Sequence, residues 1–275
     1  MDLTRISIIK KLLKKYNAKP EKYLGQHFLL SKRALRKTIE AAEIKPKNLI
    51  IEIGPGLGTL TQELAKTGAK IIAIEKDPLM NQVLKETLAD CKNVKIIQAD
   101  VRNLWVYETY KDGYKIVANL PYNIATFLIR SFLESDNPPK MMVLMIQKEV
   151  AQRICSKPPH MNLLAVSTQF LAIAEIIDYV PKNDFWPKPK VDAAIIKITP
   201  KERTSAKTLK AFFAVVKAGF SQPRKLLLSN LAKKLNFPKE RLILIFKDLD
   251  ISEKTRAENL DIDHWMKLAS RVIHN

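Results

Sequence analysis

The glycine distribution is the feature that most constrains the fold. Three of the seven glycines in this chain stand within five positions, as Gly54, Gly56 and Gly58. The preceding run, Leu49–Ile53, is β-rich, and Leu60 and Leu64 follow at helical spacing. Glycine permits a tight turn and a close approach of the backbone to a ligand. The pattern predicts a strand that turns directly into a helix, the opening unit of a sheet covered by helices.

The same alternation of β-rich and amphipathic stretches continues to about residue 146. It is typical of a parallel sheet flanked by helices, and Asp77 followed by Pro78 predicts a capped helix start. A further strand pair is expected over Ile176–Val180 and Val191–Ile198, which are rich in β-branched residues and bounded by prolines. The strands predicted for the sheet are Leu49–Ile53, Lys70–Glu75, Val94–Gln98, Lys115–Asn119 and Met141–Ile146.

The pattern changes after about Pro200. Apolar residues then recur at helical spacing with Lys and Arg between them, as in Leu209, Phe212, Phe213, Val216, Leu227 and Leu231. The sequence therefore predicts an α/β sheet domain with helices on both faces over residues 1–199 and a small all-helical domain over residues 200–275.

The charge balance indicates a polyanionic partner. Lys and Arg total 47 against 28 Asp and Glu, which gives a formal net charge of +19. The basic, amphipathic segment Ile6–Lys15 is too short and interrupted for a secretory signal, and it fits either a helix that touches phosphates or a solvated helix face. No apolar run reaches the roughly 18 residues of a membrane span. We therefore expect a soluble protein without a membrane partner.

Metal and disulfide chemistry are not expected. Cys91 and Cys155 do not form a CxxC pair, and the four histidines are scattered without ligand spacing. The cysteine usage is typical of a reducing cytoplasm.

Two acids near strand ends favour a bound adenosine. A dinucleotide fingerprint beginning at Gly54 would need glycine at position 59, which is Thr59, so a pyrophosphate ligand is disfavoured. Glu75, at the end of the second strand, is placed to accept hydrogen bonds from two ribose hydroxyls. Asp100, just after the third strand, is placed to accept one from an adenine amino group, although an exposed loop acid is the alternative.

The fourth strand runs into the tetrapeptide Asn119, Leu120, Pro121 and Tyr122. The exocyclic amine of adenine is a poor nucleophile, because its lone pair is delocalised into the ring. An Asn oxygen and a neighbouring main-chain carbonyl, held by a proline, can accept hydrogen bonds from that amine and localise the pair, without a strong base. Tyr122 offers a ring for stacking. A plain strand-ending turn is the alternative interpretation.

In these motifs the chain resembles the ribosomal RNA adenine dimethyltransferase family. The resemblance runs from Tyr23 to about Leu231. It rests on Leu24-Gly-Gln-His-Phe-Leu29, the Gly54 turn, Glu75-Lys-Asp77, Asp100, Asn119-Leu-Pro-Tyr-Asn-Ile-Ala-Thr126, Phe185-Trp-Pro-Lys-Pro-Lys-Val191 and Phe220-Ser-Gln-Pro-Arg-Lys225.

The resemblance implies a Rossmann-like class I methyltransferase that uses S-adenosyl-L-methionine, yields S-adenosyl-L-homocysteine and needs no metal. It implies dimethylation at N6 of two adjacent adenosines in a hairpin loop near the 3′ end of small-subunit ribosomal RNA. The substrate would be a pre-ribosomal small subunit, and the enzyme would act in small-subunit biogenesis. The oligomeric state is open from the sequence, and a cytoplasmic monomer is the default expectation.

The resemblance also implies roles for particular residues. The implied cofactor contacts are His27, Leu29, Gly54, Glu75, Asp100 and Asn119. The implied catalytic set is Asn119, Leu120, Pro121, Tyr122 and Phe185, with Phe185 closing the acceptor pocket opposite Tyr122. The resemblance implies that the helical domain grips RNA. Its basic residues, which include Lys217, Arg224, Lys225 and Lys233, either contact RNA phosphates or form a solvated surface, and their net excess before the acidic tail favours phosphate contact.

The sequence departs from the family pattern at three places. His27 stands where the family often has Asn, and its ring nitrogen can still hydrogen-bond. Pro223 interrupts a motif that resembles Gln-Arg-Arg-Lys, and Ser156–Leu163 lacks the Gly and Tyr often found there. The last two departures concern RNA contacts more than chemistry.

Three other functions remain open from the sequence. The first is a sister enzyme that methylates a large-subunit ribosomal RNA adenine and confers antibiotic resistance. The second is a non-catalytic RNA-binding assembly or transcription factor on the same fold, in which we would expect the Asn119–Tyr122 motif to be eroded. The third, a nicotinamide oxidoreductase, is disfavoured by the glycine spacing.

Overall fold

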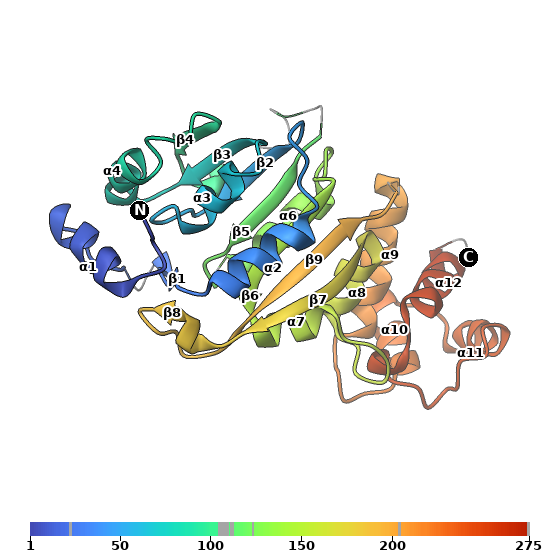
Figure 1. Ribbon diagram of the computed structural model, residues 1–275. Coiled ribbons are helices and arrows are strands. Elements are labelled where there is room, and N and C mark those ends of the chain that lie inside the picture. Colours follow the sequence, from blue (N-terminus) through green and yellow to red (C-terminus); the bar gives the residue numbers. More distant parts are fainter. Residues whose placement is uncertain (22–23, 104–109, 111–112, 123, 203–204, 274–275) are drawn as a thin grey trace. The chain divides into compact units, whose positions relative to one another are not determined.

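The computed structural model describes residues 1–21, 24–103, 110, 113–122, 124–202 and 205–273 (Figure 1). Tyr23, where the resemblance begins, and Asn123, which belongs to the motif Asn119–Thr126, lie outside the described residues. The elements in chain order are α1 (Ile6–Lys15), β1 (Phe28–Leu29), α2 (Lys32–Ala42), β2 (Leu49–Ile53), α3 (Thr59–Ala65), β3 (Lys70–Glu75), α4 (Pro78–Thr87), β4 (Val94–Gln98), η2 (Val101–Asn103), β5 (Lys115–Asn119), α6 (Ala125–Glu134), β6 (Met141–Gln147), α7 (Lys148–Ile154), α8 (Leu163–Leu171), β7 (Ala172–Val180), η3 (Lys182–Asp184), β8 (Phe185–Trp186), β9 (Ala193–Pro200), α9 (Ala206–Gly219), α10 (Leu227–Leu235), α11 (Lys239–Asp248), η4 (Ala257–Asn259) and α12 (Ile262–Ile273).

A seven-stranded sheet with the order β4-β3-β2-β5-β6-β9-β7 forms the centre of the first part of the chain. Strands β4, β3, β2, β5 and β6 pair in parallel, whereas β9 is antiparallel to β6. The five predicted parallel strands are confirmed, and β6 is one residue longer than predicted. Because the strands are parallel, Ile53, Glu75, Gln98 and Asn119 end at the same edge of the sheet.

The two later strands begin at different residues from those predicted. Strand β7 starts at Ala172, and β9 starts at Ala193 instead of Val191. Asp192 explains the second difference. Its carbonyl accepts a hydrogen bond from the Lys148 amide at 3.0 Å, and its carboxylate accepts one from the Lys182 amide at 3.0 Å. These bonds hold Asp192 in the loop before the strand.

Both faces of the sheet are buried. Val117 and Val143 face a core cluster with residues of α2 and α3, while the alternating residues Ile116 and Met142 are also buried. Figure 1 shows α2 and α3 on the near face of the sheet and α6 behind it. This arrangement confirms the predicted α/β fold with helices on both faces.

Local sequence signals explain how two helices begin. The Asp77 carboxylate accepts hydrogen bonds from the amides of Leu79 and Met80, with Pro78 in the first turn, so the predicted start of α4 is confirmed. The predicted basic helix forms as α1, which buries Ile9, Leu12 and Leu13.

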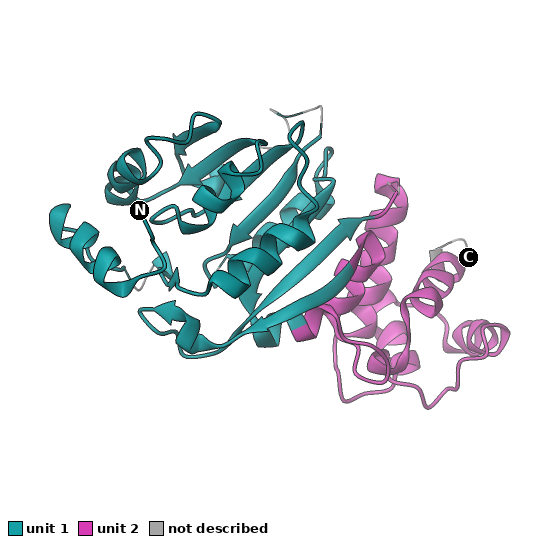
Figure 2. Cartoon of the chain, viewed as in Figure 1, with its two compact units in different colours: residues 1–151, 174–200 teal, residues 152–173, 201–275 magenta. Residues whose placement is uncertain are grey.

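The chain divides into two compact units (Figure 2). One contains residues 1–151 and 174–200, and the other contains residues 152–173 and 201–275. The single boundary expected after residue 199 therefore misses one segment, because α8 belongs with the helical unit. The reason is packing: Phe170 of α8 stacks on Phe212 of α9 with ring centroids 3.7 Å apart.

The second unit is helical, as predicted, and has its own core. Its largest buried side chains include Trp265, Phe212 and Phe246. Within the described ranges of the chain, no helix combines the length and the apolar character needed to cross a membrane.

Candidate active site

A cavity of about 320 Å³ lies at the carboxyl edge of β2, β3 and β5. It is lined entirely by residues of the first unit. Every residue predicted for cofactor binding or catalysis lines it, although these residues are widely separated in the sequence: His27, Leu29, Gly54, Glu75, Asp100, Asn119, Leu120, Pro121, Tyr122 and Phe185. The structure thus brings the predicted residues together, while their roles stay predictions.

The turn that contains Gly54 and Gly56 lines this cavity beside the Asn119–Tyr122 corner. Gly54 and Gly56 have φ values of +67° and +58°, a left-handed conformation that side-chain-bearing residues rarely adopt. A Cβ atom on Gly54 would lie 3.7 Å from the Pro121 ring, and one on Gly56 would lie 3.4 Å from the Phe28 ring. Glycine therefore lets the turn pass close to the Asn119–Tyr122 corner.

Two backbone amides hold the Glu75 carboxylate beside the glycine turn. One carboxylate oxygen accepts a hydrogen bond from the Gly56 amide at 3.0 Å, and the other accepts one from the Asp77 amide at 2.9 Å. Burial raises the pKa of Glu75, and these two hydrogen bonds oppose that effect. The carboxylate is fixed in place, and it keeps acceptor capacity toward the cavity because each oxygen has a second lone pair.

Asp100 is engaged by two cations that the sequence motifs did not indicate. Arg102 donates to its carboxylate at 2.6 Å, and the Lys76 ammonium lies 3.1 Å from the same oxygen. The Arg102 guanidinium, with help from Lys76, holds the pKa of the Asp100 carboxyl well below its usual value. Asp100 therefore carries a negative charge at the cavity wall.

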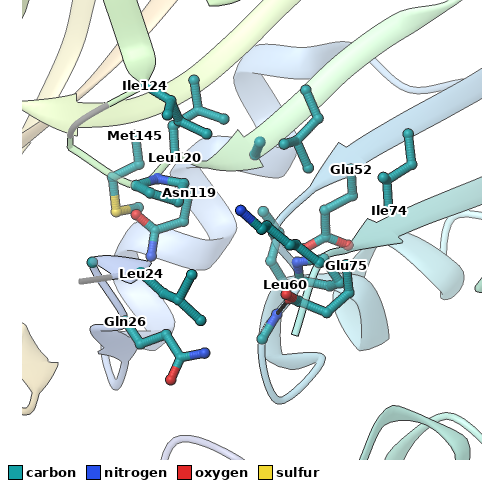
Figure 3. Close-up of a pocket in the computed structure, with 18 of the residues that line it drawn as sticks. Leu24, Gln26, Glu52, Leu60, Ile74, Glu75, Asn119, Leu120, Ile124 and Met145 are labelled. Carbon is teal, nitrogen blue, oxygen red and sulfur yellow. Dashed lines mark hydrogen bonds between the residues drawn. The ribbon is translucent and has the colours of Figure 1, made fainter. Parts of the chain in front are cut away.

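Asn119 has its side-chain amide oriented by the chain. Its Nδ2 donates to the His27 carbonyl at 3.3 Å, which fixes the orientation of the amide, and Oδ1 has no partner in the described part of the chain, so it can accept a hydrogen bond. The next residue is anchored as well, because the Leu120 amide donates to the Met145 carbonyl at 3.0 Å. Figure 3 shows Asn119 facing the cavity from the side opposite Glu75.

Tyr122 presents its ring and buries its hydroxyl. The ring stacks near His27 with centroids 6.0 Å apart, and the hydroxyl has no hydrogen-bond partner among the described residues. Burial, with smaller effects from the Glu149 and Asp192 carboxylates, raises the pKa of Tyr122 to about 12. Tyr122 therefore stays neutral, and its ring, not its hydroxyl, is the part suited to contact a base.

Strands β1 and β8 bring two distant motifs to the same wall. They pair antiparallel, with Leu29 opposite Phe185. His27 Nδ1 lies 2.6 Å from the Pro187 carbonyl, so the ring donates to that oxygen. The His27 side chain is therefore bonded to the segment that follows β8. Phe185 is only 3% exposed, which makes it part of the cavity wall.

Gln26 and Phe28 of the Leu24–Leu29 motif, which could also be plain loop-packing residues from the sequence, line the cavity. Sequence reasoning missed several other lining residues, chiefly Glu52, Thr38, Lys76, Arg102 and Met145. Glu52 is the most unusual of them. It is 2% exposed, its Oε2 has no hydrogen-bond partner in the described part of the chain, and burial raises its pKa to about 8. A lone acid in the otherwise apolar run Leu49–Ile53 was the available signal.

The four residues predicted to bind RNA lie outside this cavity, in the helical unit. Lys217, Arg224, Lys225 and Lys233 have side chains that reach solvent. No cluster of three or more metal-ligating side chains occurs among the residues that the structure describes.

Comparison with known proteins identifies the family. The family model described as ribosomal RNA adenine dimethylase matches residues 17–274. A protein named ribosomal RNA small subunit methyltransferase A from Dehalococcoides mccartyi is 38% identical over 270 residues, covering 97% of this chain and 93% of the relative. Its namesake from Clostridioides difficile is 37% identical over 272 residues, covering 96% and 94%.

Two solved structures resemble the whole fold. A dimethyladenosine transferase from Plasmodium falciparum has a TM-score of 0.75 and 28% identity, covering 88% of this chain and 96% of that one. The 23S rRNA methyltransferase ErmE has a TM-score of 0.76 at 24% identity, covering 90% and 99%, and shows likeness of fold. Taken with the site geometry and the family match, these findings establish that the chain belongs to the ribosomal RNA adenine dimethylase family.

Proposed function

We propose that this chain transfers methyl groups from S-adenosyl-L-methionine to N6 of two adjacent adenosines in a hairpin loop near the 3′ end of small-subunit ribosomal RNA. The observation that carries the proposal is the orientation of Asn119, whose Oδ1 has no hydrogen-bond partner among the described residues and can accept from an amine beside the Gly54 turn. The full-length relatives named small subunit methyltransferase A support this choice of RNA.

The cavity suits the cofactor chemically. The carboxyl groups of Glu52 and Glu75 and the left-handed glycine turn line the same space, and Glu52 Oε2 is a buried oxygen without a partner among the described residues. A cation beside a buried carboxyl group favours its ionised form, so these acids suit a cofactor that carries ammonium and sulfonium charges. When bound, S-adenosyl-L-methionine supplies an electrophilic methyl group. We assign His27, Leu29, Gly54, Glu75, Asp100 and Asn119 to hold it.

The protein's own residues prepare the acceptor. Asn119 Oδ1 accepts a hydrogen bond from the adenine amine, and a main-chain carbonyl of the Leu120–Pro121 corner accepts a second one, which localises the lone pair on nitrogen. The bound cofactor would supply the methyl group to this nitrogen and would leave as S-adenosyl-L-homocysteine, and the methylated amine would release its proton to water. Tyr122 supplies the ring on which the base stacks, with Phe185 in the opposite wall.

We also propose how the substrate is held. The cations Lys217, Arg224, Lys225 and Lys233 of the helical unit contact RNA phosphates, because the chain carries a net charge of +19. The substrate is a pre-ribosomal small subunit, and the enzyme acts as a cytoplasmic monomer.

The test is mass spectrometry of ribosomal RNA from small subunits that lack the modification, after incubation with the protein and S-adenosyl-L-methionine. We expect two adjacent N6,N6-dimethyladenosines. Methylation of naked large-subunit RNA but not of small subunits would assign the chain to the sister activity. Failure to bind S-adenosyl-L-methionine in a calorimeter would favour a non-catalytic RNA-binding role.

A further inference from the structure

Gln26 uses both ends of its side chain. Its Oε1 accepts a hydrogen bond from the Glu21 amide at 2.9 Å, and its Nε2 donates to Asp77 Oδ2 at 2.8 Å. The partner is equally committed, because Asp77 Oδ1 accepts from the Leu79 amide at 2.9 Å and caps α4. Asp77 is 7% exposed, so water cannot readily replace the amide that Gln26 supplies.

On one side, this contact leads to the predicted cofactor site. The Asp77 amide donates to Glu75 Oε1 at 2.9 Å, and Glu75 Oε2 accepts from the Gly56 amide at 3.0 Å. Gln26 is therefore joined through Asp77 to the carboxylate assigned to the ribose and to the glycine turn.

On the other side, the residues next to Gln26 in the chain contact the Asn119–Tyr122 corner, which is the predicted methyl-acceptor site. The neighbouring His27 carbonyl accepts from Asn119 Nδ2 at 3.3 Å, and this bond orients the Asn119 amide. Gly25 lies against the same corner, because a Cβ atom on it would be 3.4 Å from Pro121 Cβ. Figure 3 shows Gln26 and Asn119 on one side of the cavity and Glu75 on the other.

We propose that Gln26 is a positioning residue that sets the spacing between the cofactor half and the acceptor half of the site. It fastens the Gly25–His27 backbone, which orients Asn119, to the side chain of Asp77. The backbone amide of the same Asp77 donates to Glu75. The inference rests on the proposed methyl transfer. Alignment of donor and acceptor governs such a step, since a displacement of about 1 Å costs on the order of a hundredfold in rate.

The pair allows a reciprocal exchange. Gln26→Glu places a carboxylate against the Asp77 carboxylate, and Asp77→Asn places an NH₂ group against the Gln26 NH₂ group, while the Asn oxygen still caps α4. In the double variant Gln26→Glu/Asp77→Asn the donor and acceptor exchange sides. The hydrogen bonds to the Glu21 and Leu79 amides are then also retained.

The experiment measures single-turnover methyl transfer to unmodified small subunits at saturating S-adenosyl-L-methionine, together with the cofactor Kd by calorimetry. We expect each single variant to lower the transfer rate about tenfold or more, and the double variant to return to within about threefold of wild type. Cofactor Kd should change by less than about threefold throughout. Gln82→Glu, the same change at an exposed position of α4, is the control and should behave as wild type.

Two results would overturn the inference: single variants that transfer methyl groups at the wild-type rate, or a double variant as slow as the single ones. A loss confined to cofactor Kd would also overturn it, since it would make Gln26 a determinant of affinity only. A wild-type protein that methylates no adenine would instead refute the proposed function, and the two failures are therefore distinguishable.

Discussion

At the scale of single residues, Asn119 has two side-chain atoms with separate tasks. Nδ2 is used to fix the amide on the His27 carbonyl, and Oδ1 is what remains for the substrate. The two tasks are assigned by one hydrogen bond, whose acceptor lies 92 residues earlier in the chain. The type of residue was predictable from the sequence, whereas the orientation of its amide was not.

Replacement of Asn119 by Ala removes the acceptor without charging the site. We expect the rate of methyl transfer at saturating substrate to fall by roughly 10²- to 10³-fold, because the interaction is made mainly in the transition state. The Kd for S-adenosyl-L-methionine should remain within about threefold of wild type, because the other five residues assigned to hold the cofactor are unchanged. Rapid-quench kinetics and calorimetry measure the two quantities, and an unchanged rate would remove Asn119 from the mechanism.

Glu52 gives a prediction about stability and pH. Its pKa is raised from 4.5 to about 8 by burial, so between these values the folded state keeps a proton that the unfolded state has released. Stability is therefore lost as the pH rises through this window. Glu52→Gln should remove this pH-dependent loss of stability. Its free energy of unfolding should exceed that of wild type by on the order of a few kcal/mol at pH 9 and by little at pH 4.5.

Thermal unfolding followed by circular dichroism at the two pH values tests this prediction. The Tm of Glu52→Gln should exceed that of wild type by several degrees at pH 9 and match it at pH 4.5. Glu63→Gln, a change at a partly exposed acid on α3 that pairs with Lys66, is the control. Equal melting curves for wild type and Glu52→Gln at pH 9 would contradict the effect of burial on Glu52.

At the scale of elements, helix α1 and strand β1, which precede β2 in the chain, support one wall of the cavity. Helix α1 buries Leu12 and Leu13 in a cluster that also contains Phe28 and Leu57. Phe28 belongs to β1, which pairs with β8, and Leu57 belongs to the glycine turn. The helix is therefore an anchor for one wall of the cavity, whatever its basic face contacts.

Leu12→Ala should weaken this anchor. Leu12 is 3% exposed, and truncation of a buried leucine costs about 2–5 kcal/mol. We expect faster hydrogen exchange of the α1 and β1 amides, measured by mass spectrometry. Lys11→Ala changes the exposed face of the same helix and should leave exchange unchanged. Identical exchange in Leu12→Ala and wild type would show that α1 does not anchor the wall.

At the scale of the whole molecule, the net charge of +19 makes recognition of RNA dependent on salt. Removing Lys217, Arg224, Lys225 and Lys233 together should weaken binding to small subunits. It should also flatten the plot of log Kd against log salt, by roughly 0.7–0.9 for each phosphate that is no longer neutralised. A matched control removes Lys45, Lys47, Lys92 and Lys95, which lie near the amino ends of strands β2 and β4. Equal slopes for the two quadruple variants would argue against the helical unit as the RNA-facing surface.

The residue pattern was sufficient to predict the parallel strands, the turn at Gly54 and the order of the site motifs. These features are local: a strand is encoded by its run of β-branched residues, and parallel strands necessarily end at one edge of their sheet. For that reason the positions of Glu75, Asp100 and Asn119 at strand ends already predicted that they share one cavity.

Tertiary packing settled which distant segments meet. Strand β1 pairs with β8, Gln26 contacts Asp77, and α8 packs in the helical unit. In each case, neither the periodicity of the sequence nor the spacing of its motifs indicates which segment the partner is. The same holds for the raised pKa of Glu52, since it follows from burial on all sides. Such properties arise from three-dimensional packing, which a one-dimensional pattern does not contain.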